Sequence, residues 1–223
     1  LGAFEVDFKR NSELGDNLRA SLILTVVISA ALAIFGKIIC ILTGTEVIGI
    51  AEMIIISVIS GTLAGILVTV VGVLVSIICY RKFWDLDMVG APTVTTLGDI
   101  VTLPFLVVTA LIVMQLPFIG KAVLGALVLL MIIWAFVSFK RGTRIMMDVL
   151  REGLPLLLPL SLLGITAGVL YTSQLESLIA AAAVLILISP FMNGCGSIGG
   201  ILTSRIGTEM HMGMIDPVLF PQK

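Results

Sequence analysis

Asp99 is the residue whose type and position point most directly to chemistry in this chain. It lies within an apolar run over residues 88–115, where a carboxylate is costly unless it is kept away from lipid. Thr95, Thr96 and Thr102 are three or four residues from Asp99 and therefore share its face of a helix. A carboxylate among hydroxyls at membrane depth is typical of an ion or proton path.

A second polar face occurs near the end of the chain, over residues 189–205. Asn193, Ser197, Gly200 and Ser204 follow the spacing i, i+4, i+7, i+11, which is one side of a helix. Glycines at positions 194, 196, 199 and 200 leave the backbone accessible and permit local unwinding. Either this segment packs tightly against another helix through its small residues, or its backbone lines a watery cavity.

The oxygen atoms of these two segments suit a hard cation. The potential ligands that accompany Asp99 are hydroxyl and amide groups. No Cys or His lies beside it in the sequence, which disfavours zinc and copper. Magnesium keeps several waters and uses one or two carboxylates, so these groups could build a pore for a hydrated divalent ion. Because one Asp offers one charge against two, we expect a second copy of this motif across a symmetry axis. We also expect the helix with Asn193 to pack beside the helix with Asp99. Elsewhere, Cys40, Cys79 and Cys195 are typical of small core residues, and His211 has no potential ligand near it.

Composition places the chain among integral membrane proteins. It is 59% hydrophobic and 12% charged, whereas an ordinary soluble domain is about 25% charged. Mean hydropathy is +1.21, and the formal net charge of -1 gives no basic surface for nucleic acid. The apolar runs have helical lengths without strand-like alternation, and no signal-peptide pattern precedes them. We therefore predict an all-α membrane protein.

Six apolar runs are long enough to cross a bilayer as helices, which takes roughly 20 residues each. They cover residues 20–42, 47–79, 88–115, 121–139, 153–172 and 178–202. Pro92 and Pro104 on either side of Asp99, and the glycines of the last run, predict broken helices around a cation path. Residues 1–19 are rich in charge and are expected to form a solvated segment.

The distribution of Lys and Arg predicts the orientation. With six spans, the N-terminus, the loops at 81–87 and 140–152, and the C-terminus share one side. That side carries Lys9, Arg10, Arg19, Arg81, Lys82, Lys140, Arg141, Arg144, Arg151, Arg205 and Lys223. The other side has Lys37 and Lys121. We therefore predict a multi-pass protein of the cell membrane with both termini cytoplasmic.

Two further features lie in the second apolar run. Ser57, Gly61 and Gly65 form a small-xxx-small pattern, which lets another helix approach closely. Glu52, at the outer end of the run, is either an interfacial residue or a second ion site.

Two segments carry a family resemblance. Residues 87–103 (DMVGAPTVTTLGDIVTL) resemble the fifth helix of MgtE-type magnesium transporters and their tandem-repeat solute-carrier relatives, in which an Asp lies on the ion path. Residues 190–208 resemble the glycine-rich second helix of that family through Gly196, Ser204-Arg205 and Thr208. Two departures concern the ion preference: Ser197 follows Gly196 where the family usually has Asn, and Ala91 precedes the proline where prokaryotic members often have Asn.

The order of the two motifs implies a domain organisation, because the fifth-helix motif here comes before the second-helix motif. The tandem relatives join two five-helix repeats through one extra helix. The resemblance therefore implies five parts: a cytoplasmic segment (1–19), three helices of a first repeat (20–116), a connecting helix (117–140), two helices of a second repeat (141–210) and a tail (211–223). Residues 1–5 also resemble residues 212–216, so we expect the chain to be a piece of a longer protein.

We accordingly expect transmembrane transport of a divalent cation, most of all Mg²⁺, as the transported or bound ion. The expected metal-contacting residues are Asp99, Thr95, Thr96, Thr102, Asn193 and Ser197. The expected partners are the lipid bilayer and a second MgtE-like repeat or homodimer partner about a twofold axis, with no nucleic acid. Both a channel and a sodium- or proton-coupled exchanger are compatible with these residues.

Two other classes of protein are alternatives to a transporter. Leu97-Gly98-Asp99 is similar to the G-x-G-D motif of intramembrane aspartyl proteases, but that chemistry needs two carboxylates sharing a proton. No second Asp lies at membrane depth, so we expect no enzyme and no catalytic residues. A non-transporting membrane subunit is the other alternative, and it predicts that changing Asp99 affects assembly only.

Overall fold

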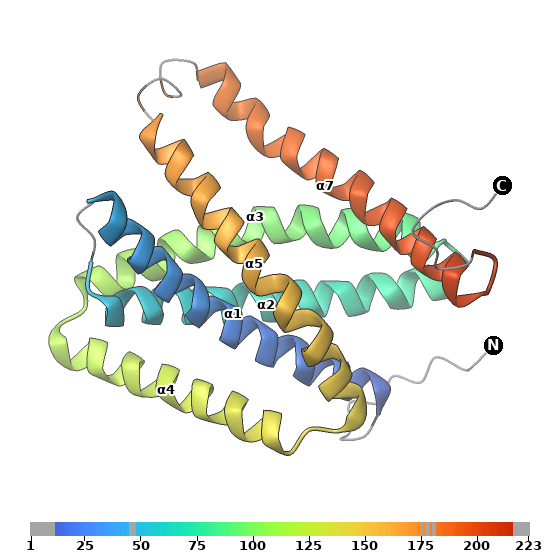
Figure 1. Ribbon diagram of the computed structural model, residues 1–223, viewed down its shortest axis with the longest axis horizontal. Coiled ribbons are helices and arrows are strands. Elements are labelled where there is room, and N and C mark those ends of the chain that lie inside the picture. The colour runs from blue at the N-terminus through green and yellow to red at the C-terminus, as the bar shows by residue number, and fades with distance from the viewer. Residues whose placement is uncertain (1–11, 45–47, 175, 177–178, 180–181, 216–223) are drawn as a thin grey trace. The chain divides into compact units, whose positions relative to one another are not determined.

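The computed structural model describes residues 12–44, 48–174, 176, 179 and 182–215. The long helices of this part are α1 (Glu13–Thr43), α2 (Ile50–Lys82), α3 (Leu86–Gln115), α4 (Phe118–Lys140), α5 (Arg144–Ser173) and α7 (Ala182–His211) (Figure 1). Within the described residues, six helices are long and apolar enough to cross a membrane. The predicted all-α membrane architecture is therefore confirmed, and each predicted span coincides with one helix.

Local sequence explains where the helices begin and end. The Ser12 side chain accepts a hydrogen bond from the Gly15 N–H at 3.1 Å and caps the start of α1. At the other end of α1, Gly44 has a φ of 71°, a left-handed conformation that suits glycine, and its N–H bonds to the last carbonyls. Pro117 precedes α4, where its missing N–H removes no helical hydrogen bond.

The described chain forms two compact units, and the boundary between them passes through α2 and α3. The first unit comprises residues up to Ile66 and Thr102–Leu175; the second comprises Leu67–Val101 and the residues from Glu176 onward. In the first unit, α1 packs against α5 and α4. Its apolar core is made of Ala20, Ile23, Val26, Ile55, Ile56, Val58, Val113, Val128, Ala135, Met146 and Leu150.

Small residues bring α1 and α2 close together in the first unit. The Ser57 hydroxyl donates to the Ser29 carbonyl at 2.7 Å, a hydrogen bond between two helices. A Cβ atom added at Gly61 would lie 2.2 Å from the Ser29 hydroxyl oxygen, and one added at Gly65 would lie 3.1 Å from a methyl of Thr25. The predicted small-xxx-small contact is therefore confirmed, and α1 is the helix that makes it.

The first turns of α1 differ from the prediction of a solvated segment over residues 1–19. Residues 1–11 lie outside the described part, but α1 already begins at Glu13 and the Asp16 side chain is buried. Thr143 donates a hydrogen bond to Asp16 at 2.7 Å, and an Arg19 nitrogen lies 3.8 Å from its carboxylate. These partners replace the water that a buried carboxylate loses, so the expectation of full solvation was wrong for Asp16.

In the second unit, α3 and α7 lie side by side and run in opposite directions. Rising residue numbers on α3 meet falling numbers on α7, from Asp87 with Thr208 to Thr96 with Asn193. Between these contacts the helices approach closely at Gly200, where an added Cβ would lie 3.2 Å from the Cβ of Ala91.

The structure also differs from the expectation of broken helices. Helix α3 continues through Pro92 and Pro104, and α7 continues through Pro190 and the glycines that follow it. A proline removes one backbone hydrogen bond and a glycine removes none, so a long helix can retain its path through either. The polar residues therefore lie on continuous helices of the described chain.

Candidate functional site

Helices α3 and α7 bring four of the predicted site residues together. Thr96 donates a hydrogen bond to the Asn193 amide oxygen at 3.2 Å, and Ser197 donates to the same oxygen at 3.1 Å. The hydroxyls of Thr95 and Ser197 lie 3.1 Å apart. We call Thr95, Thr96, Asn193 and Ser197 the α3–α7 polar cluster. The expectation that the helix with Asn193 packs beside the helix with Asp99 is confirmed by these contacts.

The cluster retains capacity to bind a ligand. Thr95 donates to the Ala91 carbonyl of its own helix at 2.9 Å, so the lone pairs of its hydroxyl remain available as acceptors. Its side chain is exposed, whereas Thr96 and Asn193 are half-buried. Three hydroxyls and one amide thus lie along the contact between two helices, in a segment that is otherwise apolar.

Asp99 lies one helical turn beyond Thr95 and Thr96 on α3. Its side chain is exposed, and it forms no hydrogen bond or ion pair with another residue of the described chain. A carboxylate midway along an apolar helix needs either water or a charged partner beside it. Thr102, one turn further along α3, is also exposed and belongs to the first unit.

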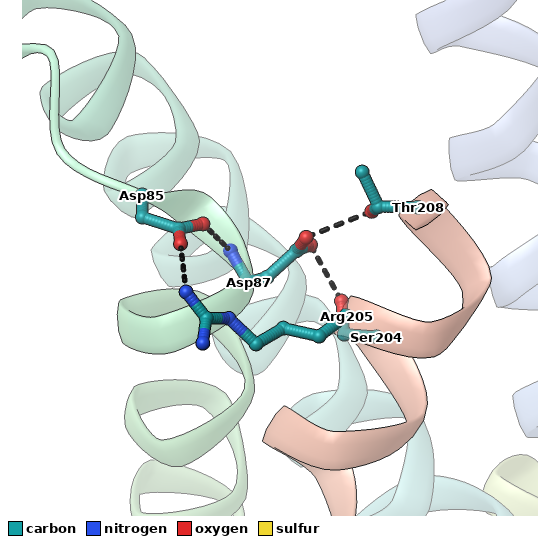
Figure 2. A network of polar contacts seen from close by, with 5 residues as sticks. All are labelled: Asp85, Asp87, Ser204, Arg205 and Thr208. Carbon is teal, nitrogen blue, oxygen red and sulfur yellow. Dashed lines mark hydrogen bonds and ion pairs between the residues drawn. The ribbon is translucent and has the colours of Figure 1, made fainter. Parts of the chain in front are cut away.

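A second polar network joins α3 and α7 at the N-terminal end of α3. Figure 2 shows the Asp87 carboxylate between two hydroxyls of α7: Ser204 donates to it at 2.6 Å and Thr208 at 2.7 Å. Asp85 accepts from the Asp87 N–H at 3.0 Å and from Arg205 at 3.4 Å (Figure 2). Asp85 thereby satisfies one of the free N–H groups of the first turn of α3.

The sequence pattern did not predict this network as a unit. Ser204 belongs to the polar face of the last apolar run, and Asp87, Arg205 and Thr208 belong to the two segments that carry the family resemblance. The network could be predicted from the spacing of Ser204 and Thr208. These residues are four positions apart, so their hydroxyls share one helix face, which can lie opposite a single carboxylate.

We expect Asp87→Ala to lower the Tm of the purified protein by about 2–4 °C, because two hydroxyls of α7 lose their shared acceptor. The contacts are partly exposed to solvent, so the loss corresponds to about 1 kcal/mol. Thermal unfolding in detergent measures it. Thr208→Val should give a smaller decrease. The matched control is Thr203→Val, since the Thr203 hydroxyl donates within its own helix to Gly199. If Thr208→Val lowers the Tm by the same amount in the parent and in Asp87→Ala, the contact between Thr208 and Asp87 is disproved.

Glu52, considered as a second ion site, has a partner in the first unit. Lys121 of α4 donates a hydrogen bond to it, and the two form an ion pair in which both side chains are about three-quarters buried, at 28% exposure each. The carboxylate therefore already has a cation beside it. An ion entering there would have to displace Lys121.

The described residues hold no group of three or more His, Cys, Asp or Glu side chains that could bind a metal directly. The oxygens of the polar cluster are instead suited to hydrogen-bonding the waters of a hydrated ion. Magnesium is bound in this way when few carboxylates are present, because it gives up its waters reluctantly. Hydroxyl and amide oxygens of this kind are chemically compatible with a hydrated hard cation.

Comparison with known proteins agrees with this chemistry. The family model MgtE, described as a divalent cation transporter, matches residues 2–109. Over those residues the resemblance predicted from the sequence is confirmed, and the match includes Asp99 and its three threonines. The segment from Pro190 to Thr208 lies outside the match, so its likeness to the second helix remains a prediction. No curated protein and no solved structure matches the chain.

Proposed function

We propose, from the premise that residues 2–109 are a segment of the MgtE divalent cation transporters, that this chain carries part of a transmembrane path for Mg²⁺. The observation that supports this most strongly is the α3–α7 polar cluster, one turn from the exposed carboxylate of Asp99. Asp99 supplies the charge that attracts the ion. Thr95, Thr96, Asn193 and Ser197 supply oxygens for its remaining waters, and Thr102 continues the same helix face.

Charge balance requires a second contribution. One carboxylate offers one negative charge to an ion with two positive charges, and Asp99 has no partner in the described chain. We propose that a second copy of the fifth-helix motif, from another repeat or another chain, faces Asp99 about a twofold axis. In the domain division described above, 20–116 and 141–210 are parts of two parallel repeats joined by 117–140, so that the fifth helix of each repeat would contribute one such motif.

Ion flux into liposomes containing the purified protein tests this function. We expect uptake of Mg²⁺ that exceeds that of empty liposomes, and comparison with Mn²⁺, Co²⁺ and Ca²⁺ establishes the selectivity. Sodium and proton gradients distinguish a channel from a coupled exchanger, because only an exchanger couples Mg²⁺ uptake to the flow of sodium ions or protons. A folded protein that transports none of these ions would contradict the proposal and favour a non-transporting subunit.

The proposed orientation has its own test. We expect the termini and the loops α2–α3 and α4–α5 to be cytoplasmic, because Lys and Arg concentrate there. In a background without native cysteines, a membrane-impermeant maleimide applied to intact cells should label Phe118→Cys, whose parent side chain is 85% exposed. It should label Phe83→Cys and Lys140→Cys only after permeabilisation. Labelling of positions 83 and 140 from opposite sides would contradict the six-span topology.

A further inference from the structure

The turn between α2 and α3 presents an aromatic ring that nothing in the described chain covers. We call residues 81–86 the α2–α3 turn, and they lie within the second unit. Phe83 is 96% exposed, more than any other large apolar side chain of the described residues, and Trp84 beside it is 53% exposed. The apolar run of α2 ends at position 79 and that of α3 begins at position 88. The turn that joins them therefore lies near the membrane–water boundary.

The backbone at Phe83 directs this ring away from the helices. Its φ is 56°, and it is the one non-glycine residue of the described chain with a positive φ. The Trp84 N–H donates to the Cys79 carbonyl at 2.9 Å, which closes a Schellman motif with Phe83 in the position that glycine usually takes. A residue with a Cβ is strained there, because the Cβ lies close to the following carbonyl oxygen. Phe83 thus holds an unfavourable conformation without burial of its ring in return, so the ring has its use outside the described residues.

Two positive charges directly precede the exposed ring. Arg81 and Lys82 are both exposed, and neither forms an ion pair with a carboxylate of the described chain. The Lys82 ammonium lies 4.9 Å from the centre of the Trp84 ring, but a ring has no net charge to neutralise it. Both cations suit the last turn of α2, where the helix dipole is negative. The dipole accounts for the charges but not for the exposed ring that follows them.

The acidic residues near the turn already have partners. Asp85 accepts a hydrogen bond from Arg205, and Asp87 accepts from two hydroxyls of α7 (Figure 2). Three cations (Arg81, Lys82 and Arg205) against two carboxylates leave a net charge of +1 around the turn. The two cations without a carboxylate partner in the described chain are those beside the exposed ring.

We propose that the α2–α3 turn is a docking surface for an anionic lipid leaflet. The Phe83 ring enters the boundary between headgroups and acyl chains, where an aromatic side chain is no longer surrounded by water. Arg81 and Lys82 bind the phosphates of the lipids around it. A zwitterionic headgroup brings a positive charge along with its phosphate, whereas an anionic headgroup balances the unpaired cations. The predicted cytoplasmic position of the turn agrees with this, because anionic lipids concentrate in that leaflet.

Fluorescence quenching by brominated lipids tests the contact. Phe83→Trp, made together with Trp84→Phe and Trp134→Phe, leaves one indole in the chain, at the tip of the turn. Bromine on an acyl chain quenches an indole that it contacts. The protein is reconstituted in phosphatidylcholine bilayers that contain the same small fraction of either brominated phosphatidylglycerol or brominated phosphatidylcholine. We expect an enrichment of phosphatidylglycerol of about fivefold or more at position 83, since each basic residue near the surface contributes about that factor.

The matched control is Phe118→Trp with both native tryptophans replaced by Phe. Phe118 is 85% exposed at the start of α4, but Lys121, the lysine of the same helix turn, is paired with Glu52. We expect this reporter to be quenched without preference for phosphatidylglycerol. Equal enrichment at positions 83 and 118 would indicate a general effect of bilayer charge and overturn the proposal. Absence of quenching by either lipid at position 83 would also overturn it, because the ring would then face protein or water.

The two cations are tested by Arg81→Gln combined with Lys82→Gln in the same reporter protein. We expect the preference for phosphatidylglycerol at position 83 to disappear while quenching by lipid remains, because the ring is still at the boundary. A preference that survives both substitutions would show that other residues attract the anionic lipid, and the role of the two cations would be wrong.

The backbone is tested by comparing Phe83→Gly with Phe83→Ala in thermal unfolding. Both variants lack the ring, but only the alanine retains a Cβ in the left-handed position. We expect the Tm of Phe83→Gly to be about 2–4 °C above that of Phe83→Ala. Equal Tm values would overturn the claim that a strained backbone holds the ring outward. Lipid contact and Tm are both independent of whether the chain transports ions.

Discussion

Replacing Asp99 by Asn is expected to abolish Mg²⁺ flux almost completely while the protein still folds. The substitution keeps size and shape but removes the charge that compensates an ion for the waters it loses in a low-dielectric path. Asp99 makes no hydrogen bond or ion pair with the rest of the described chain, so the change breaks no contact there. Flux into liposomes measures the loss, and size exclusion of the same preparation measures the folded fraction.

Two further variants are expected to cause smaller losses of Mg²⁺ flux than Asp99→Asn. Asp99→Glu should retain partial flux, because the charge survives but is displaced by about one bond length, and Mg²⁺ demands near-octahedral geometry. Thr95→Val should be milder than Asp99→Asn, since it removes a single hydroxyl that lies beside Ser197. Parent-like transport by Asp99→Asn would show that the acid is structural and that the ion path lies elsewhere.

Replacing Gly61 by Val should destabilise the protein more than Asp87→Ala does. The added Cβ would lie 3.2 Å from the Cβ of Ser29, and 2.2 Å from its hydroxyl oxygen, so α1 and α2 would have to move apart. Rotation of the Ser29 hydroxyl relieves only the second of these contacts. Overpacking of this kind typically costs about 1–3 kcal/mol. Thermal unfolding in detergent should therefore show a clear decrease in Tm.

Gly168→Val is the matched control for Gly61→Val. Gly168 lies within α5 and has no atom within 4 Å of an added Cβ, so this variant bears the same helix-propensity change without the clash. We expect Gly168→Val to remain close to the parent. If both variants lose the same stability, the effect comes from β-branched side chains in helices and the α1–α2 contact is not tightly packed.

The sequence was sufficient to predict the features that depend on local pattern. The apolar runs predicted the six helices, because apolar length alone decides whether a helix can cross a bilayer. The spacing of Ser57, Gly61 and Gly65 predicted a close helix contact. The polar faces around Asp99 and Asn193 predicted that two helices far apart in the chain would meet, since polar groups in an apolar protein find one another.

Features that depend on one distant partner could not be predicted in this way. Asp16 is buried because Thr143, 127 residues later, donates to it, and nothing near Asp16 in the sequence reveals that donor. The same holds for Asp87, whose hydroxyl partners lie 117 and 121 residues away. The prolines of α3 misled the prediction for another reason: each removes one backbone hydrogen bond, but α3 continues through both positions.

The spacing of side chains along α7 has a consequence for how α3 and α7 can slide past each other. A displacement of α7 by one turn, about 5.4 Å, exchanges each residue for the one four positions earlier. Asp87 would then keep Ser204 as a hydroxyl partner in place of Thr208, and Thr95 would meet Asn193 in place of Ser197. Ala91 would still face a glycine, Gly196 instead of Gly200. The shifted register would be poorer, because Gly200 would take the place of Ser204 at Asp87 and Ile201 would take the place of Arg205 at Asp85. The contact therefore specifies that the two helices run in opposite directions, and the network at Asp85 and Asp87 is what distinguishes one register from the next.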